Sequence, residues 1–205
     1  MSADEVITVK SGGLDPALKK ALRMALTLLI VIAASVLFLF LVHVLTADPI
    51  AAGQEAERRA SMSSVMPGAN VFSDLYSEDE TIERITGAYA GTRFLGYCVE
   101  VAADGFSGDL SLMVGVDDGG EVTGVAVLDH TETPNLGARA AQPAFLDQYI
   151  GLSGTITVNG GRNPISAVSG ATVTSRAVTD GVNRALAAVI RYIGEGGQIP
   201  DDGNI

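Results

Sequence analysis

One uncharged apolar segment, Met24–Leu45, constrains the fold of this 205-residue chain more than any other feature. Every residue in it is apolar except Thr27, Ser35 and His43. As an α-helix the segment is roughly 33 Å long, enough to cross a bilayer core of about 30 Å. The apolar region of a cleaved secretory signal is shorter, about 7–15 residues, although Leu45-Thr46-Ala47 ends in a small residue that a signal peptidase could accept. The length therefore favours a retained transmembrane helix, 24–46, over a signal peptide.

Charge is distributed unevenly about this segment. Directly before it lie Lys19, Lys20 and Arg23. The next basic residue is Arg58, so the positive-inside rule predicts a cytoplasmic N-terminus, 1–23, and export of the rest, which in a bacterium means the periplasm. Residues 1–23 have a net charge of +1, so the exported side has −12 where the whole chain has −11, and so acidic a surface argues against nucleic-acid binding. We expect His43, near the exit end of the helix, at the headgroup level rather than in a proton relay.

Beyond a juxtamembrane helix and linker, 47–69, the pattern is that of strands. Apolar residues alternate along 97–101 and again along 110–116, the period of half-buried strands. Asp117-Asp118-Gly119-Gly120 has turn chemistry, and 122–128 is again strand-like. The sequence therefore predicts a hairpin over 110–128.

Helical patterns follow the hairpin. The alanine-rich stretch 138–150 indicates a helix despite Pro143, and 174–193 has the apolar spacing of an amphipathic helix. A short strand is expected between them, at 155–158. Hairpin strands with helices grouped around them favour an α+β fold, a mixed antiparallel sheet with helices, rather than an alternating parallel sheet. This exported domain is expected to cover 70–193 and to be followed by a flexible tail, 194–205.

The composition excludes several kinds of site. A single cysteine, Cys98, cannot form a disulfide within the chain, and with only two histidines it cannot complete a zinc or iron–sulfur site. All three lysines precede residue 21, which excludes a Schiff-base lysine or the lysine of a phosphate-binding loop beyond that point. We therefore expect no metal site, and any chemistry would belong to a bound cofactor.

Two polar segments stand apart from this scaffold. Ser-Gly-Ala-Thr-Val-Thr-Ser at 169–175 comes directly before the last predicted helix, where unpaired backbone N–H groups and the helix dipole stabilise a phosphate. His-Thr-Glu-Thr-Pro-Asn-Leu-Gly at 130–137 closes the third predicted strand. On local residues alone, an ordinary N-cap and an ordinary turn are the simpler interpretations.

Together the two segments resemble the FMN-binding domain family. Ser-Gly-Ala-Thr at 169–172 is similar to the flavinylation motif, and Glu-Thr-Pro-x-Leu-Gly at 132–137 is similar to the second signature loop. Gly-Phe-Ser-Gly at 105–108 and Leu-Met-Val-Gly-Val at 112–116 are similar as well. With the N-terminal anchor, the resemblance is strongest to the G subunit of the Rnf ion-translocating electron transport complex. The C subunit of the sodium-pumping NADH:quinone oxidoreductase shares the motifs.

The resemblance implies a covalent cofactor. In the family a dedicated flavin transferase joins FMN through its phosphate to the last threonine of the motif, which corresponds to Thr172, so a phosphoester is expected there. The other expected FMN contacts are Ser169, Gly170, Ala171, Thr174 and Ser175 around the phosphate, and Glu132, Thr133 and Leu136 against the ring system. The first three would let the backbone approach closely, and Thr174 and Ser175 would hydrogen-bond the phosphate oxygens.

The implied function is that of an electron carrier in a membrane-bound, ion-translocating oxidoreductase. It would relay electrons between other membrane subunits, and it would need the flavin transferase for maturation. No stand-alone catalysis is expected. Two alternatives stay open: the equivalent subunit of a sodium-pumping NADH:quinone oxidoreductase, and an anchored exported domain that binds or assembles partners without flavin.

Two positions depart from the family pattern. Ser166 stands where an acidic residue is usual, which favours the alternative without flavin, and Asn135 stands where glycine is common. Asparagine tolerates left-handed backbone angles, so we expect the second change to be harmless. His130 could tune or protonate the flavin or be a surface hydrogen-bonding residue, and Cys98 is expected to be a packed strand residue rather than a redox centre.

Overall fold

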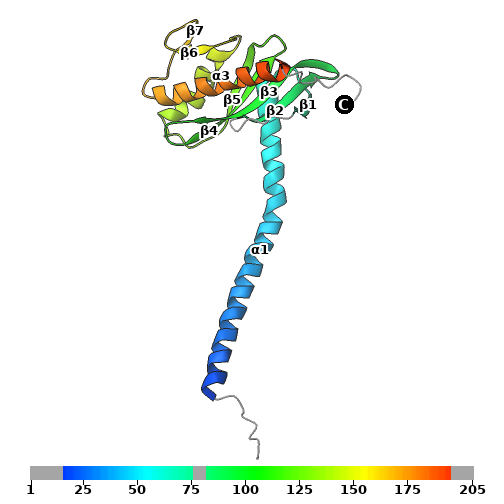
Figure 1. Cartoon of the computed structure of the whole chain (residues 1–205), viewed down its shortest axis with the longest axis vertical. Helices are drawn as coiled ribbons and strands as arrows, with labels where there is room; N and C mark the ends of the chain where they lie inside the picture. Colours follow the sequence, from blue (N-terminus) through cyan, green and yellow to red (C-terminus); the bar gives the residue numbers. More distant parts are fainter. Residues whose placement is uncertain (1–15, 76–81, 195–205) are drawn as a thin grey trace, which may run out of the picture. The chain divides into compact units, whose positions relative to one another are not determined.

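The computed structural model describes residues 16–75 and 82–194. Residues 1–15 of the predicted cytoplasmic segment and residues 195–205 of the predicted tail lie outside that part. The chain divides into two compact units, Met1–Gln54 and Glu55–Ile205. Helix α1, Pro16–Val65, runs from the first unit into the second (Figure 1).

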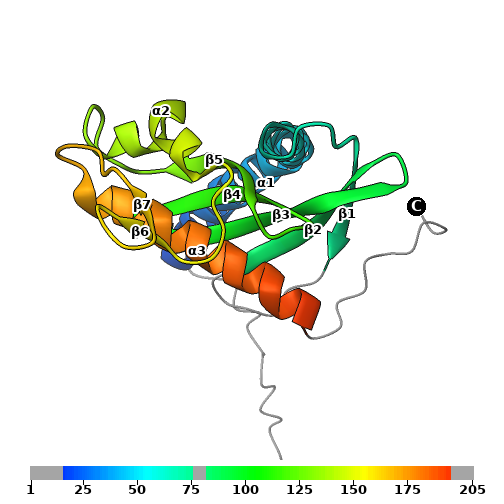
Figure 2. The same ribbon diagram turned by 90° about the horizontal axis from the view of Figure 1, so that it is seen from above.

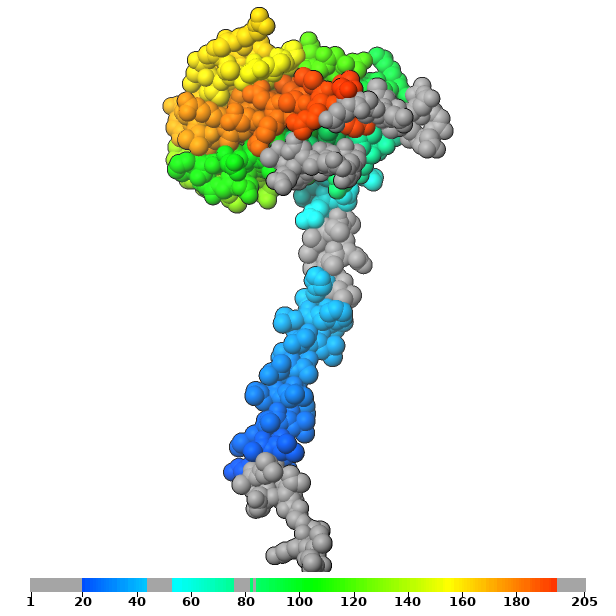
Figure 3. Space-filling model, viewed as in Figure 1, coloured from blue at the N-terminus to red at the C-terminus, as the bar shows by residue number. Residues whose placement is uncertain are grey.

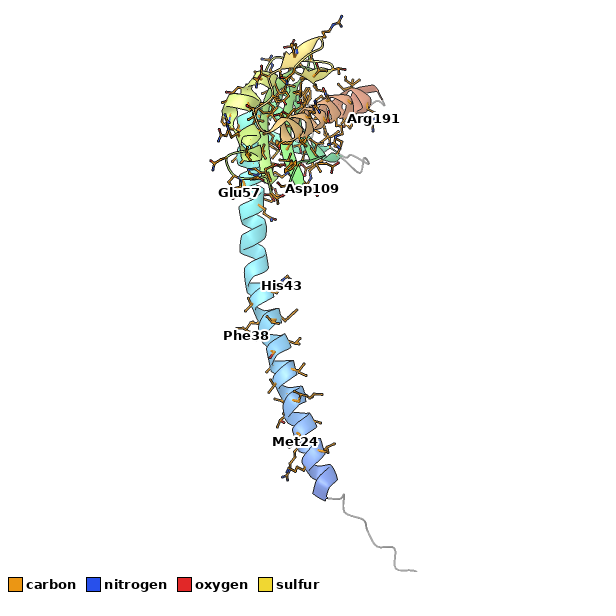
Figure 4. All side chains as sticks on the ribbon, turned by 90° about the vertical axis from the view of Figure 1, so that its left-hand side faces the viewer. Met24, Phe38, His43, Glu57, Asp109 and Arg191 are labelled. Atoms are coloured by element: carbon orange, nitrogen blue, oxygen red, sulfur yellow. The ribbon has the colours of Figure 1, made fainter. Side chains whose placement is uncertain are left out.

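The first unit contains one helical segment suited to a membrane. Lys20–His43 has a mean hydropathy of 3.0, and its most apolar window is entirely exposed. Side chains project outward along it, as Met24, Phe38 and His43 show in Figure 4. A helix that leaves so many large apolar side chains unburied needs an apolar surrounding, which a bilayer provides.

The second unit is built on a five-stranded antiparallel sheet in the order β1-β2-β3-β4-β5. The strands are β1 Val71–Leu75, β2 Ile82–Ala90, β3 Arg93–Asp104, β4 Asp109–Asp117 and β5 Val122–His130. The sheet with its helices confirms the predicted α+β class. β4 and β5 form the predicted hairpin, closed where the Gly120 N–H donates to the Asp117 carbonyl over 3.2 Å. β1 and β2 correspond to no predicted element.

Helix α3, Thr172–Gly194, covers one face of the sheet (Figure 2). Alternate residues of the central strands point to it, in cross-strand pairs such as Val99 with Val114 and Val101 with Leu112. Val178, Val182 and Val189 supply the facing apolar stripe of the helix. The opposite side of α3 forms part of the molecular surface (Figure 3). The amphipathic helix predicted at 174–193 is thus confirmed, and it starts two residues earlier, at Thr172.

The last turns of α1 cover the other face of the sheet. Met62, Val65 and Met66 pack there against Cys98 and Met113, each at most 3% exposed. The expectation of half-buried strands is therefore wrong for the middle of β3 and β4, which are buried on both sides. The residues that point away from α3 are covered by a helix distant in sequence, which local alternation cannot reveal.

Two glycines paired across β4 and β5 make room for the end of α1. Gly115 lies opposite Gly124 in the register. A Cβ on Gly124 would lie 2.8 Å from the Cα of Val65, and one on Gly115 would meet the Val65 carbonyl oxygen. The Thr123 hydroxyl donates to the same carbonyl over 2.5 Å. Helix and sheet are therefore in backbone contact, which only the absence of side chains permits.

A half-buried arginine ties α1 to the first three strands. The Arg58 guanidinium donates to Glu100 Oε2 on β3 and to Thr86 Oγ1 on β2, both over 3.0 Å, and lies 3.5 Å from Asp74 Oδ1 on β1. The side chains of Arg58 and Glu100 are 13% and 16% exposed. Because the pair is largely removed from water, we expect the loss of either partner to cost more stability than it would in an exposed ion pair.

The connection between β5 and α3 consists of short elements. They are η1 Gly137–Ala141, α2 Pro143–Leu146, η2 Asp147–Tyr149 and the parallel pair β6 Ile156–Val158 and β7 Asn163–Ile165. The predicted helix 138–150 is thus three short helices, because Pro143 forces extended backbone at Gln142 and starts a new helix. Asn183 of α3 holds the predicted strand at Ile156 through two 2.9 Å hydrogen bonds to its backbone.

Gly124→Ala is expected to destabilise the second unit by about 1–3 kcal/mol, because the added Cβ forces the end of α1 away from the sheet. The measurement is the midpoint of thermal unfolding of the detergent-solubilised chain. Gly160→Ala is the matched control, since a Cβ there meets nothing within 4 Å. Equal midpoints for Gly124→Ala and the wild type would contradict the backbone contact.

Candidate functional site

A cavity of about 360 Å³ opens where three segments of the second unit meet. Phe106 comes from the turn between β3 and β4, Glu132 to Gly137 from the loop after β5, and Gly170 to Thr174 from the start of α3. The two polar segments singled out in the sequence therefore form facing walls of one cavity. Its volume lies within the range of about 300–1,000 Å³ typical of small-molecule sites.

A buried carboxylate holds the three segments together. Glu132 is 5% exposed, and its Oε1 accepts from the N–H groups of Phe106 over 2.6 Å and Ser107 over 3.3 Å. Its Oε2 accepts from the Thr174 hydroxyl over 3.0 Å. Hydrogen bonds to a charged acceptor are stronger than those between neutral groups, so this carboxylate fixes the turn, the loop and the helix relative to one another.

Two glycines leave space for this carboxylate. A Cβ on Gly105 would collide with Glu132 Oε1, and a Cβ on Gly137 would collide with Oε2. Both Cβ–oxygen distances would be shorter than any that real Cβ atoms make. Neither glycine has a positive φ, which would be the other reason for glycine at these positions. Gly105, the first glycine of Gly-Phe-Ser-Gly, and Gly137, the last residue of Glu-Thr-Pro-Asn-Leu-Gly, thus both make room for Glu132.

The start of α3 lacks a side-chain cap. Gly170 has φ +81°, which turns the chain into the helix, and the Ala171 carbonyl accepts the first helical hydrogen bond, from the Ser175 N–H over 2.9 Å. Ala171 is therefore the N-cap residue, and its methyl group cannot accept from the N–H groups of the first turn. Those N–H groups, of Thr172, Val173 and Thr174, lie at the positive end of the helix dipole, where an anion is stabilised.

The hydroxyl groups of this segment differ sharply in their surroundings. Thr174 is 2% exposed and bonded to Glu132, and Ser175 is fully buried, donating to the Ala171 carbonyl and accepting from the Val168 N–H. Neither hydroxyl is free for a phosphate oxygen, and the structure instead uses both to shape the helix start. Thr172 is exposed and lines the cavity.

Three large apolar side chains surround the cavity mouth, one from each segment. Phe106, Leu136 and Val173 are 70%, 49% and 51% exposed. A folded domain seldom leaves so many large apolar side chains together in water, and such a group typically marks a binding surface. Phe106, Val173 and Gly137 line the cavity but were not predicted, although Gly-Phe-Ser-Gly was part of the family resemblance and could have indicated Phe106.

The other predicted contacts lie as follows. Gly170, Ala171, Thr133 and Leu136 line the cavity, whereas Ser169 and Ser175 are not among its lining residues. The Thr133 hydroxyl lies 3.2 Å from the Ser107 hydroxyl, which joins the loop to the turn a second time.

The remaining chemical candidates lie away from the cavity walls. Cys98 is buried under α1, and burial raises the pKa of its thiol to about 12, so the reactive thiolate does not form at neutral pH. His130 ends β5 and does not line the cavity. Within residues 16–75 and 82–194, no group of three His, Cys, Asp or Glu side chains could hold a metal ion.

The two departures from the family pattern have local explanations. Asn135 has φ +64°, the left-handed conformation in which asparagine substitutes for glycine at low cost. The Ser166 backbone exchanges two hydrogen bonds with the Gln148 side chain, and its own side chain is exposed outside the cavity lining.

Comparison with known protein sequences identifies the family of this chain. The family model of the FMN-binding domain matches residues 105–187, which include all three cavity segments. The G subunit of the ion-translocating oxidoreductase complex from Haemophilus influenzae is 32% identical over 73% of this chain and 80% of its own length. The chain belongs to the family of G subunits of ion-translocating oxidoreductase complexes. The G subunit of the Na(+)-translocating ferredoxin:NAD(+) oxidoreductase complex of Acetobacterium woodii, another member of this family, is 29% identical over 82% of this chain and 91% of its own length.

Solved structures give a weaker likeness. The crystal structure of the C subunit of the Na(+)-translocating NADH-quinone reductase from Parabacteroides distasonis matches with a TM-score of 0.46 and 21% identity. The match covers 54% of the present chain and 62% of the C subunit, which is less than two thirds of the C subunit's length.

Glu132→Ala is expected to destabilise the second unit by about 3 kcal/mol, because the buried Thr174 hydroxyl and two part-buried N–H groups lose their charged acceptor. Glu132→Gln should cost less, since its amide oxygen still accepts from the two N–H groups and its NH₂ can donate to Thr174. Chemical denaturation of the solubilised chain measures both.

Glu121→Ala, an exposed residue of the β4–β5 turn, is the control and should leave the free energy of unfolding unchanged. Equal stability of Glu132→Ala and Glu121→Ala would contradict the central role of the carboxylate.

Proposed function

We propose that this chain is a covalent flavoprotein that relays electrons inside a membrane-bound, ion-translocating oxidoreductase of the Rnf type. FMN would be attached as a phosphoester to Thr172 in the domain 70–193. The observation that carries the proposal is the cavity, in which Thr172 presents an exposed hydroxyl beside an uncapped helix start. Family membership supplies the cofactor class.

The surroundings of the motif hydroxyls support Thr172 as the attachment point. Of the hydroxyls between Ser169 and Ser175, those of Thr174 and Ser175 are buried and already hydrogen-bonded. Ser169 is exposed but does not line the cavity. A transferase that must reach a hydroxyl at the cavity wall in this segment therefore meets only Thr172.

The cavity fits the two halves of FMN. A phosphate on Thr172 would lie at the start of α3, where backbone N–H groups of the first turn lack a side-chain acceptor. The isoalloxazine ring would lie between Phe106, Leu136 and Val173, whose exposed apolar surfaces suit an aromatic system. Thr133 supplies a side-chain hydroxyl on the opposite wall.

The chain's own residues would bind and orient the cofactor rather than react with it. Bound FMN supplies the electron transfer, because it can be reduced and reoxidised. Glu132 holds the walls at a fixed separation through its three hydrogen bonds. A single covalent tether and a preformed cavity would keep the flavin in place without any lysine, thiol or histidine cluster.

The membrane segment supports assembly with other subunits. Lys20–His43 would anchor the chain, and the basic residues Lys19, Lys20 and Arg23 at its N-terminal end favour a cytoplasmic N-terminus with the flavin domain in the periplasm. The expected partners are the other membrane subunits of the complex and, during maturation, a flavin transferase.

Thr172→Ala is expected to abolish covalent flavin, since it removes the hydroxyl oxygen that forms the ester. The measurement is in-gel ultraviolet fluorescence after denaturing electrophoresis of the full chain, produced with its flavin transferase. The wild type should fluoresce and Thr172→Ala should not.

Thr133→Ala is the matched control, because it removes another exposed threonine hydroxyl from the same cavity and should keep the fluorescence. A non-fluorescent wild type, or a fluorescent Thr172→Ala, would overturn the proposed attachment.

The proposed orientation predicts the activity of reporter fusions. Alkaline phosphatase, which is active only outside the cytoplasm, should be active when fused after Gly194 and inactive in the same fusion from which Met24–Leu45 has been removed. An inactive fusion after Gly194 would exclude a periplasmic flavin domain.

A further inference from the structure

Arg176 lies one helical turn after Thr172 on α3. Residues four apart occupy the same helix face, with Cβ atoms about 5–6 Å apart. Both side chains are exposed, and so is Val173, which lies on the same side of the helix and lines the cavity. Arg176 therefore belongs to the cavity side of α3, although it does not itself form the wall.

The electrostatic position of Arg176 is unfavourable in the chain alone. It stands in the first turns of α3, close to the positive end of the helix dipole, where a cation is destabilising. Within the described part of the chain, no hydrogen bond or ion pair holds its guanidinium. A nearby anion would remove this unfavourable interaction.

Helix geometry directs a long side chain at position 176 towards the turn that carries Thr172. Cα–Cβ bonds in an α-helix tilt towards the N-terminus, so a long side chain covers the preceding turn. Asp180, one turn further on, is the alternative partner, but no ion pair joins the two among the described residues. A cation that precedes its anion by four residues is also the weaker arrangement on a helix.

We propose that Arg176 binds the phosphate that links FMN to Thr172. This inference rests on the proposed attachment and adds a phosphate ligand to it. The guanidinium donates two N–H groups to the non-bridging phosphate oxygens, and the backbone N–H groups at the start of α3 approach the same anion. Arg176 thereby orients the phosphoester and compensates its negative charge.

The test compares the flavinylated full chain with the same chain produced without flavin transferase. In the flavinylated chain, Arg176→Gln should lower the midpoint of thermal unfolding by about 3–10 °C, because a charge-assisted interaction is lost. In the chain without flavin, the same substitution should leave the midpoint unchanged or raise it, because a cation leaves the positive end of the helix. A purely structural role would change both midpoints in the same direction.

Arg93→Gln is the matched control. Arg93 is exposed and begins β3, at the opposite end of the strand from the turn that carries Phe106, so its substitution should act equally on both forms. If Arg176→Gln does not fold, the test is the ³¹P chemical shift of the phosphoester in the flavinylated chain. This chemical shift should change in Arg176→Lys but not in Arg93→Gln.

Equal effects of Arg176→Gln on both forms, or an unshifted ³¹P resonance in Arg176→Lys, would overturn the assignment of Arg176 while leaving Thr172 as the attachment point. A wild-type chain without covalent flavin in the presence of the transferase would overturn the proposed function, and this inference with it.

Discussion

The site depends on one interaction, the hydrogen bonding of the buried Glu132 carboxylate. Removing a carboxylate from water is costly unless its oxygens are satisfied, and here two backbone N–H groups and one hydroxyl satisfy them. Because the three donors come from the β3–β4 turn and from α3, the charge can be buried only when both lie against the loop after β5. Gly105 and Gly137 are the sterically required neighbours of the same group. The shape of the cavity is thus a consequence of burying one charge.

The chemistry of the site depends on the polar groups at the start of α3 that the Glu132 network does not use. The hydroxyls of Thr174 and Ser175 are hydrogen-bonded within the domain. The exposed hydroxyl at the cavity wall in this segment is therefore that of Thr172. Because the N-cap residue Ala171 has no side-chain acceptor, backbone N–H groups of the first turn are available to an anion. Arg176 follows Thr172 by one helical turn. The opposite face of the sheet is closed independently, by α1 against Gly115 and Gly124 and by the Arg58 ion pairs. One sheet therefore carries the end of α1 on one face and α3, which lines the cavity, on the other.

Much of this could be predicted from local sequence patterns, and the rest could not for definable reasons. The apolar period of 3.6 identified α3, the period of two identified the β4–β5 hairpin, and the two polar segments that form the cavity walls were both indicated. β1 and β2 were not predicted. In β2, register shifts between Ile82 and Arg84 and between Ala88 and Tyr89 interrupt the alternation, and the burial of Ala88 beside the end of α1 depends on tertiary packing. Glu132, Thr174 and Ser175 were expected to be cofactor contacts. Glu132 and Thr174 are partners 42 residues apart in the chain, so no local signal could show that these two side chains bond to each other, whereas Ser175 bonds to residues within its own segment.

Which hydroxyl carries the flavin can be decided by a single spectrum. Trypsin cleaves after Arg162 and Arg176, which releases one peptide, 163–176, containing Ser166, Ser169, Thr172, Thr174 and Ser175 together. Fragmentation mass spectrometry of this peptide, from the chain matured with its transferase, should locate one FMN phosphoester on Thr172 alone. An FMN on any other hydroxyl, or an unmodified peptide, would contradict the assignment of Thr172.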